Sequence, residues 1–113
     1  MSVMKGKNFR HLNAFILLAL AKEDNHGGGV YTVLSETLPN FNVDTGAIYR
    51  CLKELESNGA VEFKWENPEK GPAKKVYTIT EVGFKELKEW EKDIESRLAN
   101  LKYFLETYRQ LNQ

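Results

Sequence analysis

The feature that most constrains the fold is an abrupt change of hydrophobic period at Gly59. Before this glycine, apolar side chains recur at three- and four-residue steps, as on one face of a helix; they are Ile48, Leu52 and Leu55. After it, every second side chain is apolar, as in a half-buried strand; these are Val61, Phe63 and Trp65. The sequence therefore predicts a short helix that runs directly into a β-strand.

Both ends of this helix are marked by residues that favour helix termini. Asp44 precedes it and is a good N-cap, because its carboxylate can accept hydrogen bonds from the N–H groups of the first turn. Asn58 and Gly59 follow it, and both residue types readily adopt the left-handed conformation that ends a helix. The outer face of the helix carries a mostly polar set of residues: Gly46, Tyr49, Arg50, Lys53 and Ser57.

The strand after Gly59 is the first half of a predicted hairpin. Residues 67–72 contain asparagine, proline and glycine, which together favour a turn. A second alternating run, residues 74–79, then returns along the first. An isolated two-stranded hairpin is only marginally stable in water, so its aromatic face is expected to lie against the helices. The tip of the hairpin is basic and carries Lys70, Lys74 and Lys75.

Two helices are predicted ahead of this unit. The first carries an apolar stripe that ends where residues 23–29 become polar and glycine-rich; its members are Phe9, Leu12, Phe15, Ile16, Ala19 and Leu20. The second is about three turns long and stops at Pro39; its apolar members are Val30, Tyr31, Val33, Leu34 and Leu38. Three helices followed by a hairpin predict a mainly α fold with a β-hairpin wing, a winged helix-turn-helix over residues 1–80.

A long helix is predicted over residues 81–113, with Thr80 as its N-cap. Its apolar positions form a heptad seam interrupted at Glu91. At about 1.5 Å per residue the helix is roughly 40 Å long, more than a domain of this size needs for its own core. We therefore expect dimerisation through a second copy of the helix, and the alternative is a helix folded back over its own domain. The expected dimerisation residues are Leu87, Ile94, Leu98, Leu101, Leu105 and Tyr108.

The charge distribution permits a basic face on a neutral chain. The 113 residues hold 16 basic and 16 acidic side chains, but residues 1–22 contain four basic residues and no acid. Residues 64–77 add four lysines against two glutamates. Phosphate responds to such local charge, although ordinary solvated lysines would give the same count. A single cysteine, Cys51, and the lack of a long apolar run predict a soluble cytoplasmic protein of one domain.

Three motifs resemble the PadR family of bacterial transcriptional regulators. Residues 26–34 read HGGGVYTVL, residues 46–56 read GAIYRCLKELE, and residues 71–81 read GPAKKVYTITE. They are similar to the start of the family's second helix, to its recognition helix and to its wing. The resemblance implies a short-form, DNA-binding repressor that dimerises through its C-terminal helix, so a palindromic operator is expected. It also implies a possible site for flat aromatic effectors at the dimer centre, here lined by Phe15, Trp90, Ile94 and Tyr103.

Some residues depart from the family pattern. Gly28 and Gly29 replace a tyrosine and a glutamate and should loosen the start of the second helix, since glycine costs about 1 kcal/mol against alanine in a helix. Ala47 replaces a threonine, which removes a hydroxyl donor. Arg50 replaces a proline, so it is the best candidate for bidentate contact with guanine in the major groove.

The remaining predicted contacts divide between bases and phosphates. Tyr49 is expected to present its hydroxyl to a phosphate or base edge, and the alternative is a ring packed in the core. Thr45 and Lys53 would hold the DNA backbone, beside Gly46 on the same helix. From the wing, the three lysines at positions 70, 74 and 75 would follow the phosphates.

Other functions receive less support from the sequence. His11, His26 and Cys51 show no metal-ligand spacing, the glycine run at residues 27–29 lacks dinucleotide-site spacing, and we expect neither an enzyme nor a cofactor. Cys51 is interpreted as a small core residue, with a redox sensor as the alternative. The competing function is a winged helix that docks on another protein without sequence-specific DNA binding.

Overall fold

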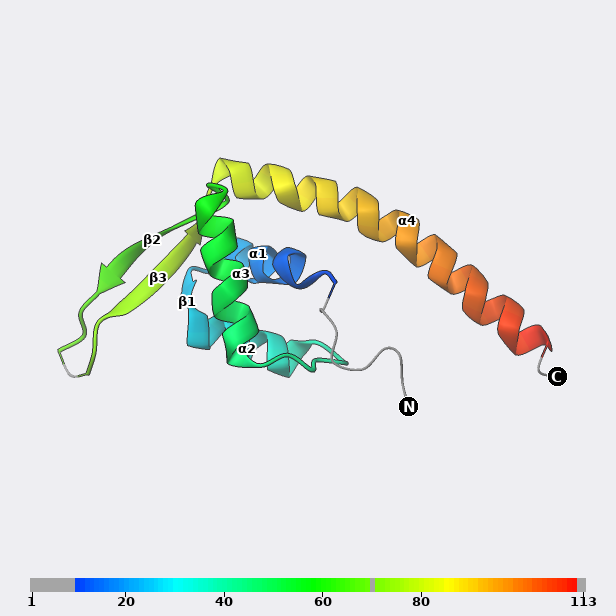
Figure 1. Cartoon of the computed structure of the whole chain (residues 1–113), viewed down its shortest axis with the longest axis horizontal. Coiled ribbons are helices and arrows are strands. Elements are labelled where there is room, and N and C mark those ends of the chain that lie inside the picture. Colours follow the sequence, from blue (N-terminus) through cyan, green and yellow to red (C-terminus); the bar gives the residue numbers. More distant parts are fainter. Residues whose placement is uncertain (1–9, 70, 112–113) are drawn as a thin grey trace.

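The computed structural model describes residues 10–69 and 71–111 and has the predicted winged-helix architecture. Three helices precede the two long strands of the wing, and a long helix follows them (Figure 1). The elements are α1 (Leu12–Lys22), β1 (Asn25–His26), α2 (Gly27–Thr37), α3 (Thr45–Ser57), β2 (Val61–Glu66), β3 (Lys74–Ile79) and α4 (Glu81–Leu111). Two residues named above, Phe9 and Lys70, lie outside the described residues.

The core forms where the apolar stripes of α1, α2 and α3 meet the base of the sheet. The fully buried side chains come from every one of these elements: Ile16, Leu17, Leu20, Val30, Ile48, Leu52, Leu55 and Val61. The stripe predicted for α3 is therefore confirmed. Those of α1 and α2 are confirmed in part, because Leu17 is buried outside the predicted stripe and Val33, within it, is 37% exposed. Phe15 contributes only partly and packs at the edge of this core.

The junction between α3 and β2 explains the change of period at Gly59. Asp44 caps the start of α3 by accepting a 2.9 Å hydrogen bond at Oδ1 from the N–H of Ala47. At the other end, the N–H of Ala60 donates to the carbonyl of Leu55 at 2.9 Å, and the N–H of Gly59 donates to Glu56 at 3.0 Å. Gly59 has a φ of 81°, in the left-handed region. This Schellman motif stops the helix and directs the chain into the strand.

The sheet has three antiparallel strands in the order β1-β3-β2, so the prediction of a two-stranded hairpin was incomplete. β2 pairs with β3 from Val61↔Ile79 at the base to Glu66↔Lys74 near the tip. On the other side of β3, β1 places Asn25 opposite Tyr77. Two residues are too few to show a sequence period, which is why β1 was missed. This strand fixes the start of α2 beside the wing.

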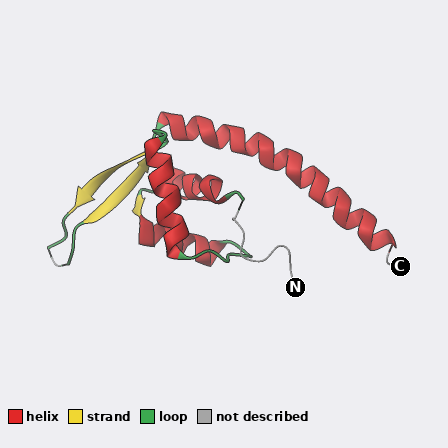
Figure 2. Cartoon of the chain, in the orientation of Figure 1, coloured by secondary structure: helices red, strands yellow, loops and turns green. Residues whose placement is uncertain are grey.

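The wing is buried at its base and exposed toward its tip. Val61 is only 2% exposed, whereas Trp65, on the same face of β2, is 59% exposed. The expectation that the whole aromatic face lies against the helices is therefore wrong at Trp65. The hairpin extends beyond the helical body, as Figure 2 shows for the two long strands.

Helix α4 has an attached proximal part and a projecting distal part. Thr80 Oγ1 accepts a 3.2 Å hydrogen bond from the N–H of Gly83 and donates to the carbonyl of Gly59, which ties the predicted cap to the end of α3. Leu87 and Trp90 pack against the core. Beyond them α4 leaves the body (Figure 1), and the molecule measures 62 Å along its longest axis. The distal part is thus not folded back over its own domain.

No helix within residues 10–69 and 71–111 combines the length and apolarity needed to cross a membrane.

Candidate nucleic-acid interface

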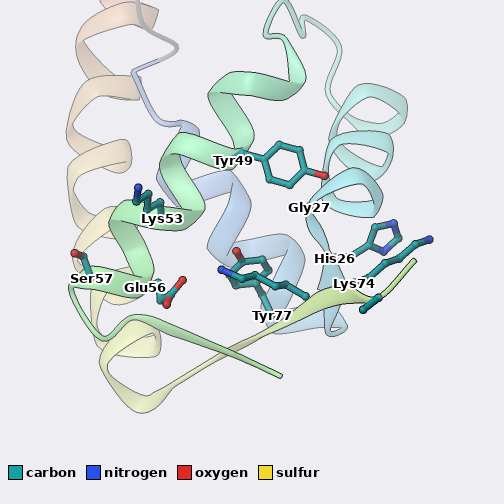
Figure 3. Close-up of a pocket in the computed structure, with 10 residues that line it drawn as sticks. His26, Gly27, Tyr49, Lys53, Glu56, Ser57, Lys74 and Tyr77 are labelled. Atoms are coloured by element: carbon teal, nitrogen blue, oxygen red, sulfur yellow. The ribbon is translucent and has the colours of Figure 1, made fainter. Parts of the chain in front are cut away.

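A groove of about 680 Å³ joins α3 to the wing and to the start of α2 (Figure 3). Its lining comes from four elements and one loop: His26, Gly27, Tyr49, Lys53, Glu56, Ser57, Ala73, Lys74, Lys75 and Tyr77. The fold thus brings two residues of the predicted recognition helix, Tyr49 and Lys53, beside two of the predicted wing lysines. Thr45, Gly46 and Arg50 belong to α3 but do not line this groove.

Tyr49 lies across the N-terminus of α2. Its side chain points from α3 toward Gly27 (Figure 3), and a Cβ atom at position 27 would lie 2.8 Å from its Cζ. Tyr49 remains 51% exposed. The ring is therefore supported on one side by a glycine and open on the other, so the alternative of a ring packed in the core is wrong. Only the absence of a side chain at Gly27 permits this approach.

Arg50 is exposed and curls back along α3. Its Nη1 would lie 3.2 Å from a Cβ at Gly46, which places the guanidinium beside the first turn of the helix. In helix-turn-helix proteins the N-terminal part of the recognition helix meets the base edges. Arg50 is thus placed where its charge can reach that end of α3, separate from the groove.

Lys75 is held by aromatic side chains of the wing. Its Nζ lies 4.1 Å from the ring centroid of Phe63 and 5.8 Å from the ring of Trp65. Such cation–π contacts contribute about 0.5–1 kcal/mol at exposed sites. They restrict a side chain that would otherwise be free to sample many rotamers, and they keep the ammonium at the groove.

His26 is a groove residue that the sequence interpretation did not propose as a site. It follows Asn25 in β1, where it pairs with Val76 and so faces the wing. Asn25 Oδ1 accepts a 2.9 Å hydrogen bond from the His26 N–H, which helps to shape this short strand. No local pattern could have indicated His26, because its place depends on a pairing with a strand about fifty residues later in the chain.

The charge of the groove is positive with one internal acid. Lys53, Lys74 and Lys75 line it together with Glu56. Burial raises the pKa of the Tyr77 phenol, and the charges of Glu56 and Tyr49 raise it further. Tyr77 therefore stays neutral at physiological pH, and the three ammonium groups dominate the local field.

Cys51 is half-buried on α3. Burial raises the pKa of its thiol and the carboxylate of Glu54 adds to this effect, while the guanidinium of Arg50 opposes both. Since the thiolate is the reactive form, these surroundings favour the small packing residue over the redox sensor.

A second, apolar groove of about 470 Å³ lies between α1 and α4. Its lining includes Phe15, Trp90 and Ile94, three of the four residues predicted to bind an effector. The fourth, Tyr103, does not line it in the single chain and is 69% exposed on distal α4, so its place in a cavity at the dimer centre stays a prediction. The Trp90 indole is fixed by a 3.1 Å hydrogen bond from its Nε1 to Glu86.

Comparison with known proteins gives matches in both sequence and structure. The transcriptional regulator PadR-like family matches residues 16–89. PadR of Bacillus subtilis in complex with operator DNA is 30% identical with a TM-score of 0.65, over 70% of this chain and 46% of that one. A PadR-like transcriptional regulator of Bacillus cereus is 26% identical with a TM-score of 0.67, over 81% and 91%. A conserved protein of unknown function described as a potential transcriptional factor is 29% identical with a TM-score of 0.78, over 96% and 97%.

No curated protein matches the chain. The family match nevertheless covers more than half of the 113 residues and contains α3, the complete wing and the proximal turns of α4. It also includes every residue that lines the groove. The chain belongs to the PadR-like family of transcriptional regulators.

Proposed function

We propose that this regulator is a repressor that binds a palindromic operator as a homodimer. The observation that carries the proposal is the groove in which Tyr49 and Lys53 of α3 lie beside Lys74 and Lys75 of the wing. A duplex placed against this surface would meet a recognition helix and a basic wing together. The similar PadR of Bacillus subtilis is in complex with operator DNA, which supports DNA binding by this chain.

The proposed contacts fall into two groups. Arg50, beside Gly46, would read base edges at the N-terminal end of α3, where one good bidentate pair contributes about 1–3 kcal/mol of discrimination, while Thr45 would hold the DNA backbone. The lysines at positions 53, 74 and 75 would bind phosphates and carry little sequence information. Lys70, at the tip, lies outside the described residues and remains a prediction for the same role.

Dimerisation through distal α4 is the second part of the proposal. Apolar side chains there are strongly exposed in the single chain, including Leu98, Leu101, Phe104 and Leu111, the last at 80%. A contiguous apolar stripe of this kind indicates an interaction surface. A second copy of the seam would cover it and would space two recognition helices one turn of DNA apart, at about 34 Å.

An aromatic effector is the third part of the proposal. The groove between α1 and α4 is apolar and contains a fixed indole at Trp90, beside Phe15 and Ile94. In a dimer, the partner helix would come close to this groove, and Tyr103 of either copy could then reach it. Replacing Trp65 with Phe would leave Trp90 as the fluorescent reporter, and planar aromatic compounds should quench it.

The test is a gel shift with the promoter region of the chain's own gene. Lys74→Ala/Lys75→Ala should weaken binding to all duplexes and lower the slope of log affinity against log salt by about 4, because the homodimer loses four phosphate contacts that contribute about 0.9 each. Arg50→Ala should instead reduce the preference for the operator over other DNA. Equal affinities of the double variant and the parent at low and high salt would contradict the wing assignment.

Regulation and location are tested in the cell. A reporter driven by the same promoter should be more active when the gene for this protein is deleted, if the protein is a cytoplasmic repressor. Lack of any DNA footprint at low salt would favour the alternative of a winged helix that docks on another protein.

A further inference from the structure

Packing within the fold does not explain why a tryptophan stands at position 65 of the wing. Trp65 lies on the face of β2 that also carries Val61 and Phe63, yet it is 59% exposed. The side chain of Trp65 contributes little to the core, because Phe63, the next residue toward the base on the same face, is the one that packs against the core. An exposed tryptophan beside a charged groove indicates a binding surface more strongly than a single exposed leucine does.

The surroundings of Trp65 form a continuous aromatic row along the wing. Its ring meets the ring of Phe63 edge-on, with centroids 6.0 Å apart, and Phe63 in turn lies 5.9 Å from the ring of Tyr77. Trp65 is paired with Lys75 across the strands, and the Lys75 ammonium lies over this row. Because Lys75 and Tyr77 line the groove, the row extends the surface of the groove toward the tip.

The two faces of the hairpin differ in charge. Along β2, Glu62, Lys64 and Glu66 alternate with the aromatic residues and therefore lie on the opposite face. There Lys74 of β3 pairs with Glu66, and the formal charges cancel. On the face of Trp65, the described residues of β2 and β3 place a lysine and no carboxylate. This face of the two strands therefore combines a positive charge with an apolar ring, without a carboxylate to repel the phosphates of a duplex.

We propose that Trp65 contacts the sugar–phosphate backbone of duplex DNA, with its indole against a deoxyribose next to the phosphate bound by Lys75. This inference rests on the proposed DNA-binding function. The indole would supply an apolar contact that does not depend on salt, while the neighbouring ammonium supplies the ionic one. Because sugars are the same in every sequence, the contact adds affinity without preference among bases.

The contact is tested with a generic duplex of about 30 base pairs, long enough for two half-sites one turn apart. Trp65→Ala should lower affinity about tenfold, within the range of aromatic contacts to nucleic acid, at both about 50 and about 200 mM salt. The salt slope should stay at the parent value. Lys75→Ala, the matched control on β3, should lower the slope by about 2, because each of the two protomers loses one phosphate contact. Trp65→Phe should retain most of the affinity.

A second measurement uses Trp90→Phe, in which Trp65 is the only tryptophan. Addition of the duplex should change the Trp65 emission. Unchanged emission, equal affinities of Trp65→Ala and the parent, or a loss that disappears in the Lys75→Ala background would each overturn the proposal. In the last case Trp65 acts only by positioning the lysine. A parent that binds no duplex would instead contradict the DNA-binding function itself.

Discussion

At the scale of single residues, the position of Tyr49 depends on the absence of a side chain at Gly27. The sequence placed Tyr49 on the outer face of α3 but could not show that its ring rests on a glycine of another helix. That contact exists because β1 and the start of α2 lie beside the groove. The sequence pattern marks Gly28 and Gly29 as departures that loosen a helix, whereas it is their neighbour Gly27 that makes room for a side chain of the candidate interface.

Gly27→Ala should displace the Tyr49 ring and weaken DNA binding while leaving the fold intact. The added Cβ overlaps only the end of a side chain that can rotate away, and alanine is well tolerated in a helix. We expect the free energy of unfolding to change by less than about 1 kcal/mol. Binding isotherms should show a loss in the parent background and none in Tyr49→Ala. An equal loss in both backgrounds would contradict the role of the ring.

Alkaline pH should destabilise the protein through Tyr77 and Cys51. Their pKa values are raised in the fold above the ordinary values of 10.0 and 9.0, chiefly by burial. Both groups ionise to anions, so the stability they contribute is complete below those ordinary values and is lost as pH rises through the folded ones. Urea midpoints should therefore be constant near neutral pH and decline above about pH 9.

The matched variant for this prediction is Cys51→Ala/Tyr77→Phe, which removes both ionisations and keeps the aromatic ring. Its urea midpoint should decline less at high pH than that of the parent. A parallel decline in the two proteins would assign the effect to other groups.

At the scale of elements, local signals predicted those helices and strands that have caps and periods of their own. Asp44, Gly59 and Thr80 each mark a boundary by a backbone hydrogen bond or a backbone conformation that only a few residue types provide. β1 has no such signal and exists because β3 offers it a partner. Trp65 was predicted to be buried because alternation gives the face of a residue but not how far the neighbouring helices extend.

Gly59→Ala should destabilise the junction between α3 and β2. A side chain in the left-handed conformation costs about 1 kcal/mol or more, and Gly59 has a φ of 81°. Thermal unfolding should show a lower midpoint. Gly28→Ala is the control, since a Cβ there would meet the His26 ring at an ordinary 3.5 Å and alanine favours a helix. An equal or higher midpoint for Gly59→Ala would contradict the requirement for glycine.

At the scale of the whole molecule, α4 has a proximal and a distal part that differ in what their side chains contact. Proximal α4 belongs to the winged-helix body, because Gly83 is buried and Leu87 packs on the core. Distal α4 projects from that body with its apolar seam exposed. The predicted boundary at residue 81 thus coincides with the start of the helix, while the packing changes several turns later.

Leu98→Glu/Leu101→Glu should convert a dimer into a monomer. Both leucines are about 60% exposed in the single chain, at 61% and 62%, so the charges are tolerated by the isolated fold but not in a helix pair. Light scattering should report the mass of one chain, with the circular dichroism of the parent. Lys102→Glu, a neighbouring exposed position outside the seam, should remain dimeric. A variant that keeps the parent mass would locate the interface elsewhere.

The sequence by itself determined the order of the elements, their main boundaries and the resemblance to PadR regulators, because caps, glycines and hydrophobic periods act over a few neighbouring residues. Only the tertiary structure decided that Tyr49 rests on Gly27, that His26 joins the wing, and that Trp65 stays exposed beside Lys75. Each of these depends on segments far apart in the chain. Their contacts are set by how the helices and the sheet pack, and the hydrophobic period of a short segment carries no information about that packing.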